Sequence, residues 1–425
     1  MHILAASAAC LAATAAAASC PRPPSSSSSS FATTMLDSII SRQQGRLSDS
    51  GAASSTLESG ILAQAIEAVI AQHPHTKSRY AQYLSDVLDV ASAPTKKLTN
   101  STTASLRPLD RFSLATAIQS ALDSGIAPVT SQSLQARDAI HASLAIQKRN
   151  PDHGLWYYVY PEWSYLDGVF SLLPYMASQP QPDHQDMMLQ IRLLSEHCTQ
   201  PNTSLPVHGY DWSRKAVWAD RNTGASPYVW GRPLGWFIAG LVQTWDQLSC
   251  HHQHHAADKT GAGTGNANAN ANAYDQLCQL IQEQTSHISA ALLKYADPET
   301  GAWWQIVTLP GQKGNYLESS STALFIFSYL KAVRTGLLSG GDDAAGEAYK
   351  RAALKAYEYT NRVFVTKSAG NGNGNGTVGF DKTVAVCSLN STATYEYYVK
   401  QPLSPNSLLG ESAYILASLE VERLR

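Results

Sequence analysis

The repeated helical pattern of apolar residues constrains the fold of this chain more than any other feature. Apolar residues recur at spacings of three and four over long segments, which turn signals separate at intervals of roughly 20 to 30 residues. In residues 231–249, for example, one helical face carries Trp236, Ile238, Leu241, Val242 and Trp245. Strand-like alternation is confined to short runs such as 155–161 and 303–309. The pattern therefore predicts an all-α protein of roughly eleven or twelve helices.

The predicted helices are spread evenly along the chain. They cover 57–73, 77–91, 109–124, 131–147, 165–179, 183–198, 231–249, 274–295, 316–337, 343–364 and 406–422. Such a series fits either helical hairpins closed into a toroid or an open solenoid. In the closed form, the ends of helices and their connecting loops line one mouth of a barrel. Polar and aromatic motifs that directly precede a helix are therefore the candidate functional residues.

Composition narrows the classes of partner. The 425 residues include 31 Lys and Arg against 33 Asp and Glu, a net charge of -2. This balance gives no electrostatic case for nucleic acid or an anionic membrane as the main partner. The 20 Tyr and 9 Trp outnumber the 8 Phe, and aromatic side chains with a polar edge suit sugar-binding clefts. Ordinary filling of a large core explains the same composition equally well.

The N-terminal segment has the features of a secretory signal. Residues 1–19 are uncharged, small and apolar, and end in a small-residue cleavage site before Cys20. A short membrane anchor is the alternative interpretation, because the positive n-region is weak. Residues 20–32 form a Pro/Ser-rich linker or tail. We expect 33–425 to be one catalytic domain of a secreted, extracellular protein, with no later membrane span.

Two low-complexity inserts, at 251–273 and 370–376, interrupt the predicted domain and are expected to be flexible surface loops. The first carries a histidine run that could bind metal, formed by His251, His252, His254 and His255. A solvated loop is the favoured interpretation, and the sequence implies neither a metal nor a cofactor.

Secretion makes disulfides and glycans plausible. Cleavage before Cys20 leaves five cysteines without metal-type spacing, and Cys250 to Cys278 is the predicted disulfide because it closes the first insert. Sequons that fit a glycosylated surface occur at Asn100, Asn202, Asn375 and Asn390.

Two aspartates that each precede a helical pattern are candidate catalytic groups. Asp110 lies in LRPLDRFSLATAI, where an N-cap role is the simpler local interpretation. Asp167 lies in YLDGVFSLLPYM among apolar residues, where a carboxylate must be capped, paired or protonated. For Asp167, an N-cap and an acid catalyst fit the local sequence equally well.

Two further segments are rich in polar and aromatic residues. VHGYDWSRKAVWAD contains His208 and is too polar for a core. In VWGRPLGWF, Pro233 suits the first turn of a helix, which places Arg232 at or just before the N-cap. An arginine is unfavourable at the positive end of a helix, so a bound anion would explain it. Trp230 and Trp236 could stack on a sugar, although core packing explains Trp236 as well.

Taken together, the motifs resemble the unsaturated rhamnogalacturonyl hydrolases, glycoside hydrolase family 105. The resemblance rests on WGRPLGW, which matches W-x-R-x-x-G-W, and on YLDGVFSLLPYM, HGYD, ETGAWWQIV, GNYLESSSTALF and TYEYYV in the family's order. These segments cover roughly residues 105–420. The aromatic residue found near the first helix of family members has no clear counterpart in ESGILAQ at 58–64.

The resemblance implies an (α/α)6 barrel of six helical hairpins and an unusual reaction, the hydration of the C4=C5 enol ether in a terminal unsaturated uronate. It implies that Asp167 is the general acid/base and that Asp110 assists as a second catalytic carboxyl. It also implies substrate-binding positions, which correspond to His208, Trp230, Arg232 and Trp236, and we add Leu109 to them. The expected substrate is an unsaturated galacturonyl oligosaccharide derived from rhamnogalacturonan or pectin, and the expected enzyme is a monomer.

Two alternatives remain open on the sequence. An unsaturated glucuronyl hydrolase of glycoside hydrolase family 88 would share the barrel and the chemistry but take a glucuronate-type substrate. A helical barrel that binds sugars without catalysis would keep the aromatic residues, although Asp110 and Asp167 argue against it.

Overall fold

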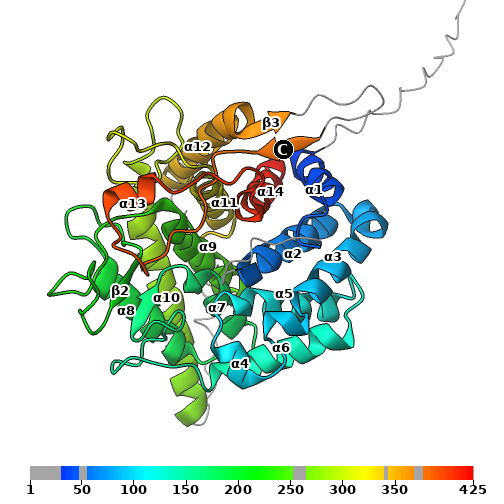
Figure 1. The fold of residues 1–425 in the computed structure, drawn as a ribbon, viewed down its shortest axis with the longest axis horizontal. Helices are drawn as coiled ribbons and strands as arrows, with labels where there is room; N and C mark the ends of the chain where they lie inside the picture. The colour runs from blue at the N-terminus through cyan, green and yellow to red at the C-terminus, as the bar shows by residue number, and fades with distance from the viewer. Residues whose placement is uncertain (1–29, 47–54, 252–264, 339–342, 368–376, 425) are drawn as a thin grey trace, which may run out of the picture.

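Six helices of the described chain form a closed inner ring in the computed structural model, which describes residues 30–46, 55–251, 265–338, 343–367 and 377–424 (Figure 1). They are α2 (Ser55–Gln72), α5 (Arg111–Ser124), α7 (Gly168–Ala177), α9 (Gly231–Gln247), α11 (Ser319–Arg334) and α14 (Leu408–Glu422). Each packs against the next, and α14 packs against α2. The contacts therefore close the ring and exclude an open solenoid.

The remaining long helices lie outside this ring. They are α1 (Phe31–Ser41), α3 (Lys77–Ala91), α6 (Ser131–Leu144), α8 (His184–Cys198), α10 (Gly265–Leu293) and α12 (Asp343–Tyr359). Helices α3, α6, α10 and α12 pack against α2, α5, α9 and α11, while α8 contacts α7 and α10, and α1 contacts α14 and α2. Outer and inner helices alternate along the chain, as expected for a barrel of six helical hairpins.

The two rings differ in the distribution of their apolar residues. Every residue of α7 is buried, and so is every residue of α9 from Gly231 to Trp245. Helices that are apolar all round are stable only when other elements surround them. The outer helix α3 buries a single face, which includes Tyr80, Leu84 and Leu88. The burial of α7 and α9 on all sides is therefore explained by their place in the inner ring, where other helices surround them.

The two runs with strand-like alternation, at 155–161 and 303–309, do not form regular strands. Their residues form only isolated bridges, such as Trp230 with Ile306 and Trp304 with Leu317, because they are mouth loops without a long partner strand. The regular strands are β1 (Trp163–Tyr165) paired with β2 (Gly209–Asp211), and β3 (Val365–Lys367) paired with β4 (Val378–Phe380). The first pair places Tyr165 opposite Gly209, so it joins the segments that precede α7 and α9.

Shorter elements complete the described chain. The short helices are α4 (Ser101–Ser105) and α13 (Tyr395–Val399). Single turns of other helical types are η1 (Pro74–Thr76), η2 (Pro94–Lys96) and η4 (Thr360–Phe364).

The chain ends and inserts differ in part from expectation. Helix α1 was not predicted and begins at Phe31, inside the expected tail, because Ser30 caps it and Met35, Leu36 and Ile39 are buried. Helix α10 begins at Gly265, so 265–273 is helical rather than a loop. Alanine, the residue with the highest helix propensity, fills every second position of 267–273. Residues 252–264 and 370–376 lie outside the described residues, as do 1–19 and the histidines of the run after His251.

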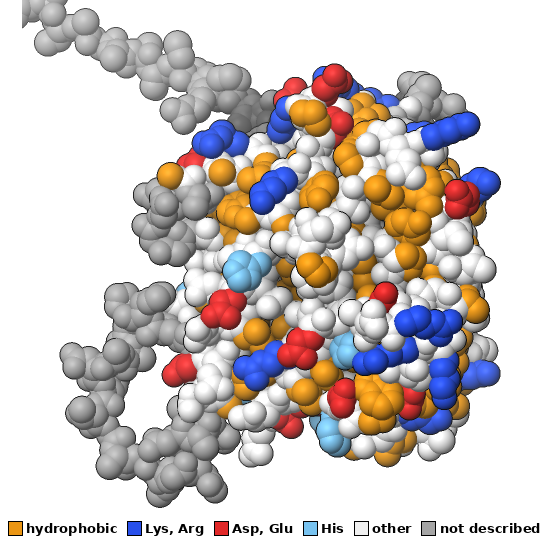
Figure 2. Space-filling view, turned by 90° about the vertical axis from the view of Figure 1, so that its left-hand side faces the viewer, with side chains coloured by type: hydrophobic (Ala, Val, Ile, Leu, Met, Phe, Trp, Pro, Cys, Tyr) orange, Lys and Arg blue, Asp and Glu red, His pale blue; other side chains and the backbone are white. Residues whose placement is uncertain are grey.

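The disulfide between Cys250 and Cys278 is confirmed, and it ties the end of α9 to α10. Cys198 and Cys387 are buried free thiols. No helix among the described residues combines the length and apolarity needed to cross a bilayer. On the face shown in Figure 2, acidic and basic side chains are interspersed among hydrophobic and uncharged ones.

Candidate active site

A cavity of about 190 Å³ opens where the N-terminal ends of the inner helices converge. Its lining includes Leu57 of α2, Asp110 and Asp167 directly before α5 and α7, Arg232 of α9 and Leu409 of α14. The amino ends of helices carry partial positive charge, so several of them at one cavity favour an anionic ligand. The resulting arrangement places two carboxyl groups in a site suited to an anion.

Asp110 is fully buried and does not cap α5. Its backbone already has helical torsions, and its side chain makes no capping hydrogen bond. Instead, Oδ2 accepts a hydrogen bond of 2.7 Å from the Tyr157 hydroxyl, while Oδ1 has no partner. Burial raises the pKa of Asp110 to about 8; the Tyr157 hydrogen bond opposes this rise and the charge of Asp167 adds to it. Asp110 thus occupies the N-cap position of α5 without a capping hydrogen bond, and its burial favours the protonated form of the side chain at neutral pH.

Asp167 is paired with His208 and does not cap α7. The Asp167 Oδ2 atom lies 3.3 Å from His208 Nε2, within ion-pair distance but without a hydrogen bond, and the Asp167 side chain retains 13% exposure. His208 is 1% exposed, and its Nδ1 lies 2.9 Å from the Tyr398 hydroxyl. The imidazole is thus held between a tyrosine and the carboxyl group, which is the less buried member of this chain of contacts.

Trp230 and Arg232 form a buried unit at the start of α9. The helix begins at Gly231, so Trp230 is its N-cap residue and Arg232 lies within the first turn, slightly later than predicted. The Arg232 guanidinium lies 4.8 Å from the centre of the Trp230 ring and donates hydrogen bonds to the carbonyls of Val384 and Ala385. Arg232 therefore anchors a loop in addition to lining the cavity.

Of the other two predicted binding residues, one lines this cavity and one does not. Trp236 is 1% exposed and packs against Phe170 with ring centroids 4.6 Å apart, while its surface still borders the cavity. It acts as both core and cavity wall. Leu109 lines a neighbouring small apolar cavity together with Gly168. Its backbone N–H donates to the carbonyl of Tyr157, so it supports the site from behind.

Much of the aromatic wall of this cavity was not predicted from the sequence. Tyr157, Tyr158, Tyr160 and Tyr165 all border the cavity, and Tyr157 stacks on Tyr165 with ring centroids 4.5 Å apart. Their density between residues 157 and 165 was the available signal, but the run was interpreted as a strand. A second missed segment, Val386 to Ser388, lines the cavity from a loop distant in sequence. No local pattern distinguishes this segment.

The sequence of the chain matches one family model over most of its length. The model of Glycosyl Hydrolase Family 88 matches residues 76–425. Among curated proteins, the 24.9 kDa protein in picA locus of Rhizobium radiobacter is 28% identical over 220 residues, which cover 51% of this chain and 81% of that protein.

Solved structures share the fold across nearly the whole chain. A glycoside hydrolase of family 105 from C. acetobutylicum superposes with a TM-score of 0.73 at 22% identity, covering 93% of this chain and all of that one. The unsaturated glucuronyl hydrolase of Bacillus sp. GL1, responsible for the degradation of glycosaminoglycan, has a TM-score of 0.58 at 14% identity, covering 92% and 95%. At these identities the likeness establishes the helical barrel.

Proposed function

Because the chain belongs to Glycosyl Hydrolase Family 88, we propose that it removes a terminal 4,5-unsaturated galacturonate from oligosaccharides derived from rhamnogalacturonan or pectin. The observation that carries the proposal is the pair of unlike carboxyl groups in one cavity at the amino ends of the inner helices. Asp110 is fully buried and Asp167 is partly exposed beside His208. Carboxyl groups in such different surroundings can take different roles in proton transfer.

The proposed reaction is a hydration followed by ring opening. Asp167 delivers a proton to C4 of the enol ether, and a water molecule adds to C5 as the same carboxylate removes a proton from it. The product is a hemiketal at C5. The hemiketal opens to a ketone at C5 when the bond between C5 and the ring oxygen breaks, which leaves a hemiacetal at C1. This hemiacetal then collapses to an aldehyde, and the neighbouring sugar leaves with the glycosidic oxygen. One well-placed catalytic carboxyl suffices here, whereas ordinary glycosidases use two that flank the scissile bond.

Asp110 has a supporting role in this scheme. With a pKa of about 8, it is a neutral acid at pH 7, and its Oδ1 is not engaged by the protein. A protonated Oδ1 can donate a hydrogen bond to a ring hydroxyl or to the attacking water. Ionisation of Asp110 would add a second negative charge beside the uronate carboxylate, so burial of Asp110 also lowers repulsion of the substrate.

The cavity offers complementary groups for the rest of a uronate. The N-terminal ends of the inner helices and the guanidinium of Arg232 supply positive potential for the carboxylate. Trp230 and the tyrosines around Tyr157 supply polar-edged aromatic surface for a sugar ring. We assign the carboxylate to the Arg232 side and the C4=C5 bond to the Asp167 side.

A comparison of matched substrates tests the proposed specificity. Unsaturated oligosaccharides made by a rhamnogalacturonan lyase and unsaturated glycosaminoglycan disaccharides are given to the same enzyme, and kcat/KM is measured for each. We expect preference for the galacturonyl substrate. Preference for the glucuronyl substrate would assign the chain to the glucuronate-type activity, and binding without turnover of either would indicate a sugar-binding barrel.

We also propose that the protein acts outside the cell as a glycosylated monomer. The Cys250 to Cys278 disulfide supports an oxidising compartment. The sequon residues Asn100, Asn202 and Asn390 are exposed and accessible to glycosylation. N-terminal sequencing of the secreted protein, with its mass before and after deglycosylation, tests cleavage and glycans, and sedimentation tests the oligomeric state.

A further inference from the structure

Gln305 lies in the segment between α10 and α11 and joins two parts of the active site that are distant in sequence. It is fully buried. The indole Nε1 of Trp230 donates a hydrogen bond of 2.9 Å to Gln305 Oε1, and Gln305 Nε2 donates one of 3.2 Å to the carbonyl of Tyr398. Trp230 precedes α9 and lines the active-site cavity, while Tyr398 lies on α13. One side-chain amide therefore connects these two elements.

The chemistry of the two partners of Gln305 selects an amide at this position. An indole N–H can only donate a hydrogen bond and a backbone carbonyl can only accept one, so the residue between them must present an acceptor and a donor. A side-chain amide carries both groups, whereas a carboxylate has no donor and an apolar side chain has neither. Replacement of Gln305 by an apolar residue would leave both partners without their hydrogen bond in a buried site, which is unfavourable.

The backbone of Gln305 is also tied to the start of α9. The N–H of Gly231 donates to the Gln305 carbonyl at 3.0 Å, and the N–H of Gln305 donates to the Tyr316 carbonyl at 2.8 Å. Gly231 is the first residue of α9 and directly precedes Arg232. Backbone and side-chain hydrogen bonds thus together fix Gln305 relative to the residues that line the cavity.

The amide of Gln305 closes a ring of contacts around the imidazole of His208. The hydroxyl of Tyr398 lies 2.9 Å from His208 Nδ1, and the edge of one ring faces the other between His208 and Trp230, with centroids 4.9 Å apart. His208 is therefore in contact with both residues that Gln305 connects. Its Nε2 lies 3.3 Å from the carboxyl group of Asp167, so a shift of Trp230 or Tyr398 would change the surroundings of that carboxyl group.

We propose that Gln305 is a positioning residue for proton transfer at Asp167. Its amide keeps Trp230 and Tyr398 in a fixed relation, and the imidazole of His208 takes its orientation from both. Gln305 is itself fully buried, so it acts on the substrate only through these residues. Its role in turnover rests on the function proposed above, whereas its effect on the imidazole can be measured without turnover.

NMR of the full-length protein with labelled histidine rings tests the effect on the imidazole, and His208→Gln assigns the signals of His208. Gln305→Met keeps the length of the side chain and removes both of its hydrogen bonds. We expect Gln305→Met to shift the ring signals of His208 and to leave those of the other histidines nearly unchanged. Unshifted His208 signals in the folded variant would overturn the proposal.

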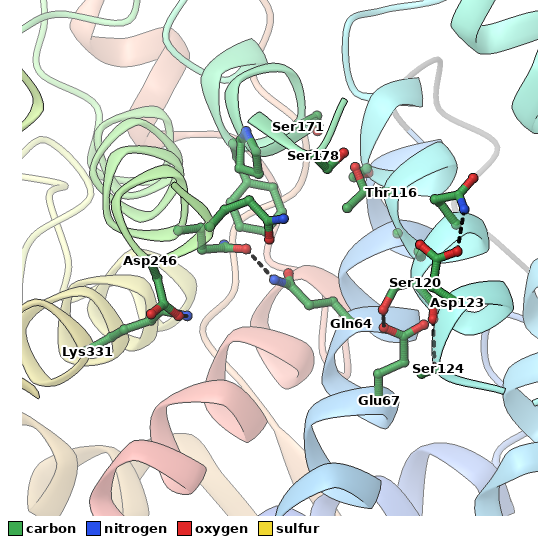
Figure 3. Close-up of a pocket in the computed structure, with 18 residues that line it drawn as sticks. Gln64, Glu67, Thr116, Ser120, Asp123, Ser124, Ser171, Ser178, Asp246 and Lys331 are labelled. Atoms are coloured by element: carbon green, nitrogen blue, oxygen red, sulfur yellow. Dashed lines mark hydrogen bonds and ion pairs between the residues drawn. The ribbon is translucent and has the colours of Figure 1, made fainter. Parts of the chain in front are cut away.

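Gln64→Met is the matched control. Gln64 lines a second cavity, toward the C-terminal ends of α5, α7 and α9, where its amide donates a hydrogen bond to Gln243 (Figure 3). The control variant also removes a glutamine hydrogen bond from the interior of the barrel, but it leaves the link between Trp230 and Tyr398 intact. It should change neither the His208 signals nor kcat and KM.

Kinetics on the unsaturated oligosaccharides test the effect on catalysis. After correction for the folded fraction, Gln305→Met should lower kcat by about 10-fold or more and shift the pH profile of kcat in the same direction as His208→Gln. With His208→Gln already present, Gln305→Met should lower kcat by no more than about threefold further, because the imidazole is already absent. Losses that multiply in the double variant, or a kcat and pH profile like those of the wild type for Gln305→Met, would overturn the proposal.

Gln305→Glu offers a rescue and covers the case in which Gln305→Met does not fold. A protonated carboxyl group resembles the amide in shape and also carries one acceptor and one donor, whereas a carboxylate cannot donate to the Tyr398 carbonyl. The kcat of Gln305→Glu should therefore approach that of the wild type at low pH, where burial keeps the new carboxyl group protonated, and fall as that group ionises. A kcat that is at least about 10-fold below the wild type at every pH from about 5 to 8 would overturn the proposal. If the wild type turns over none of the substrates, the proposed function fails, and the His208 signals alone decide whether Gln305 places the imidazole.

Discussion

His208 Nε2 lies 3.3 Å from Asp167 Oδ2, and the opposite ring nitrogen of His208 lies 2.9 Å from the Tyr398 hydroxyl. The imidazole therefore spans two elements that are distant in sequence, the segment before α7 and the short helix α13. Because His208 is 1% exposed and ringed by Tyr165, Trp230 and Tyr398, its orientation is fixed by packing. A rigidly packed imidazole therefore lies beside the Asp167 carboxyl in the lining of the cavity.

This geometry predicts that His208 is a positioning residue for the acid/base. His208→Gln should lower kcat by roughly 10²-fold with a smaller change in KM, because Asp167 loses its partner and its alignment. Steady-state kinetics across pH give the split between kcat and KM and show whether the ionisation that limits kcat has moved. Tyr398→Phe is the milder control. A rate and pH profile like those of the wild type for His208→Gln would contradict the positioning role.

Burial of Asp110 predicts a pH-dependent stability. Its pKa rises from 3.8 in the unfolded chain to about 8 in the folded one, so the unfolded chain loses this proton first. Between pH 3.8 and pH 8, each rise of one pH unit therefore lowers the free energy of unfolding by about 1.4 kcal/mol. The free energy of unfolding stops falling above pH 8. Asp110→Asn cannot ionise and escapes this loss.

Denaturant unfolding of wild type and Asp110→Asn at pH 5, 6.5 and 8 measures this difference. The variant should gain stability relative to wild type as the pH rises, by several kcal/mol over the series. Its activity should fall, and the alkaline limb of kcat/KM near pH 8 should disappear or move. A stability difference that stays constant with pH would show that Asp110 is ionised in the folded protein throughout this range.

Arg232 is expected to be both structural and functional. Arg232→Ala leaves the Val384 and Ala385 carbonyls without their donor and frees the loop that carries Cys387 and Ser388 to the cavity. We expect a loss of about 2 to 4 kcal/mol in stability and a fall in kcat/KM of ~10- to 1000-fold. Arg232→Lys should not restore either, because one ammonium cannot reproduce the planar fork of the guanidinium. If Arg232→Lys had the stability and kcat/KM of the wild type, Arg232 would act through its charge alone.

The disulfide should contribute to stability without affecting catalysis. Cys250 and Cys278 are 28 residues apart and tie α10 to the end of α9, far along the chain from the catalytic carboxyls. Replacing both with serine should lower the free energy of unfolding by about 2 to 4 kcal/mol and leave kcat/KM unchanged. Thermal unfolding with parallel kinetics provides the test, and a large loss of kcat/KM in the folded variant would be unexpected.

The helical barrel was predictable because its signals are local and repeated. Most inner and outer helices lie within a few residues of the periodic segments, and Asp167 was recognisable as a carboxyl among apolar neighbours just before one of them. The mouth loops were not predictable in the same way. The residues around Tyr157 show the alternation typical of a strand, yet they form a loop beside the active-site cavity. There their side chains contact other aromatic rings, and their backbone groups bond to other loops.

The roles of individual site residues depended on contacts between distant segments. No local pattern shows that Arg232 bonds to the carbonyls of Val384 and Ala385, or that Tyr398 contacts His208. The local sequence favoured a capping role for the Asp110 side chain, and only the folded chain shows that its carboxyl accepts a hydrogen bond from the Tyr157 hydroxyl instead. The sequence patterns identified the candidate catalytic residues, but the partners of these residues come from distant segments and are known only from the fold.

The catalytic role of Asp167 is tested by following the ultraviolet absorbance of the enol-ether carboxylate during incubation with lyase-generated rhamnogalacturonan oligosaccharides. Wild-type enzyme and Asp167→Asn are compared after both are shown to be folded. We expect wild type to remove the absorbance and release the saturated oligosaccharide, while Asp167→Asn loses at least about 10³-fold in rate. Unchanged absorbance with wild type, or equal rates for the two proteins, would contradict that role.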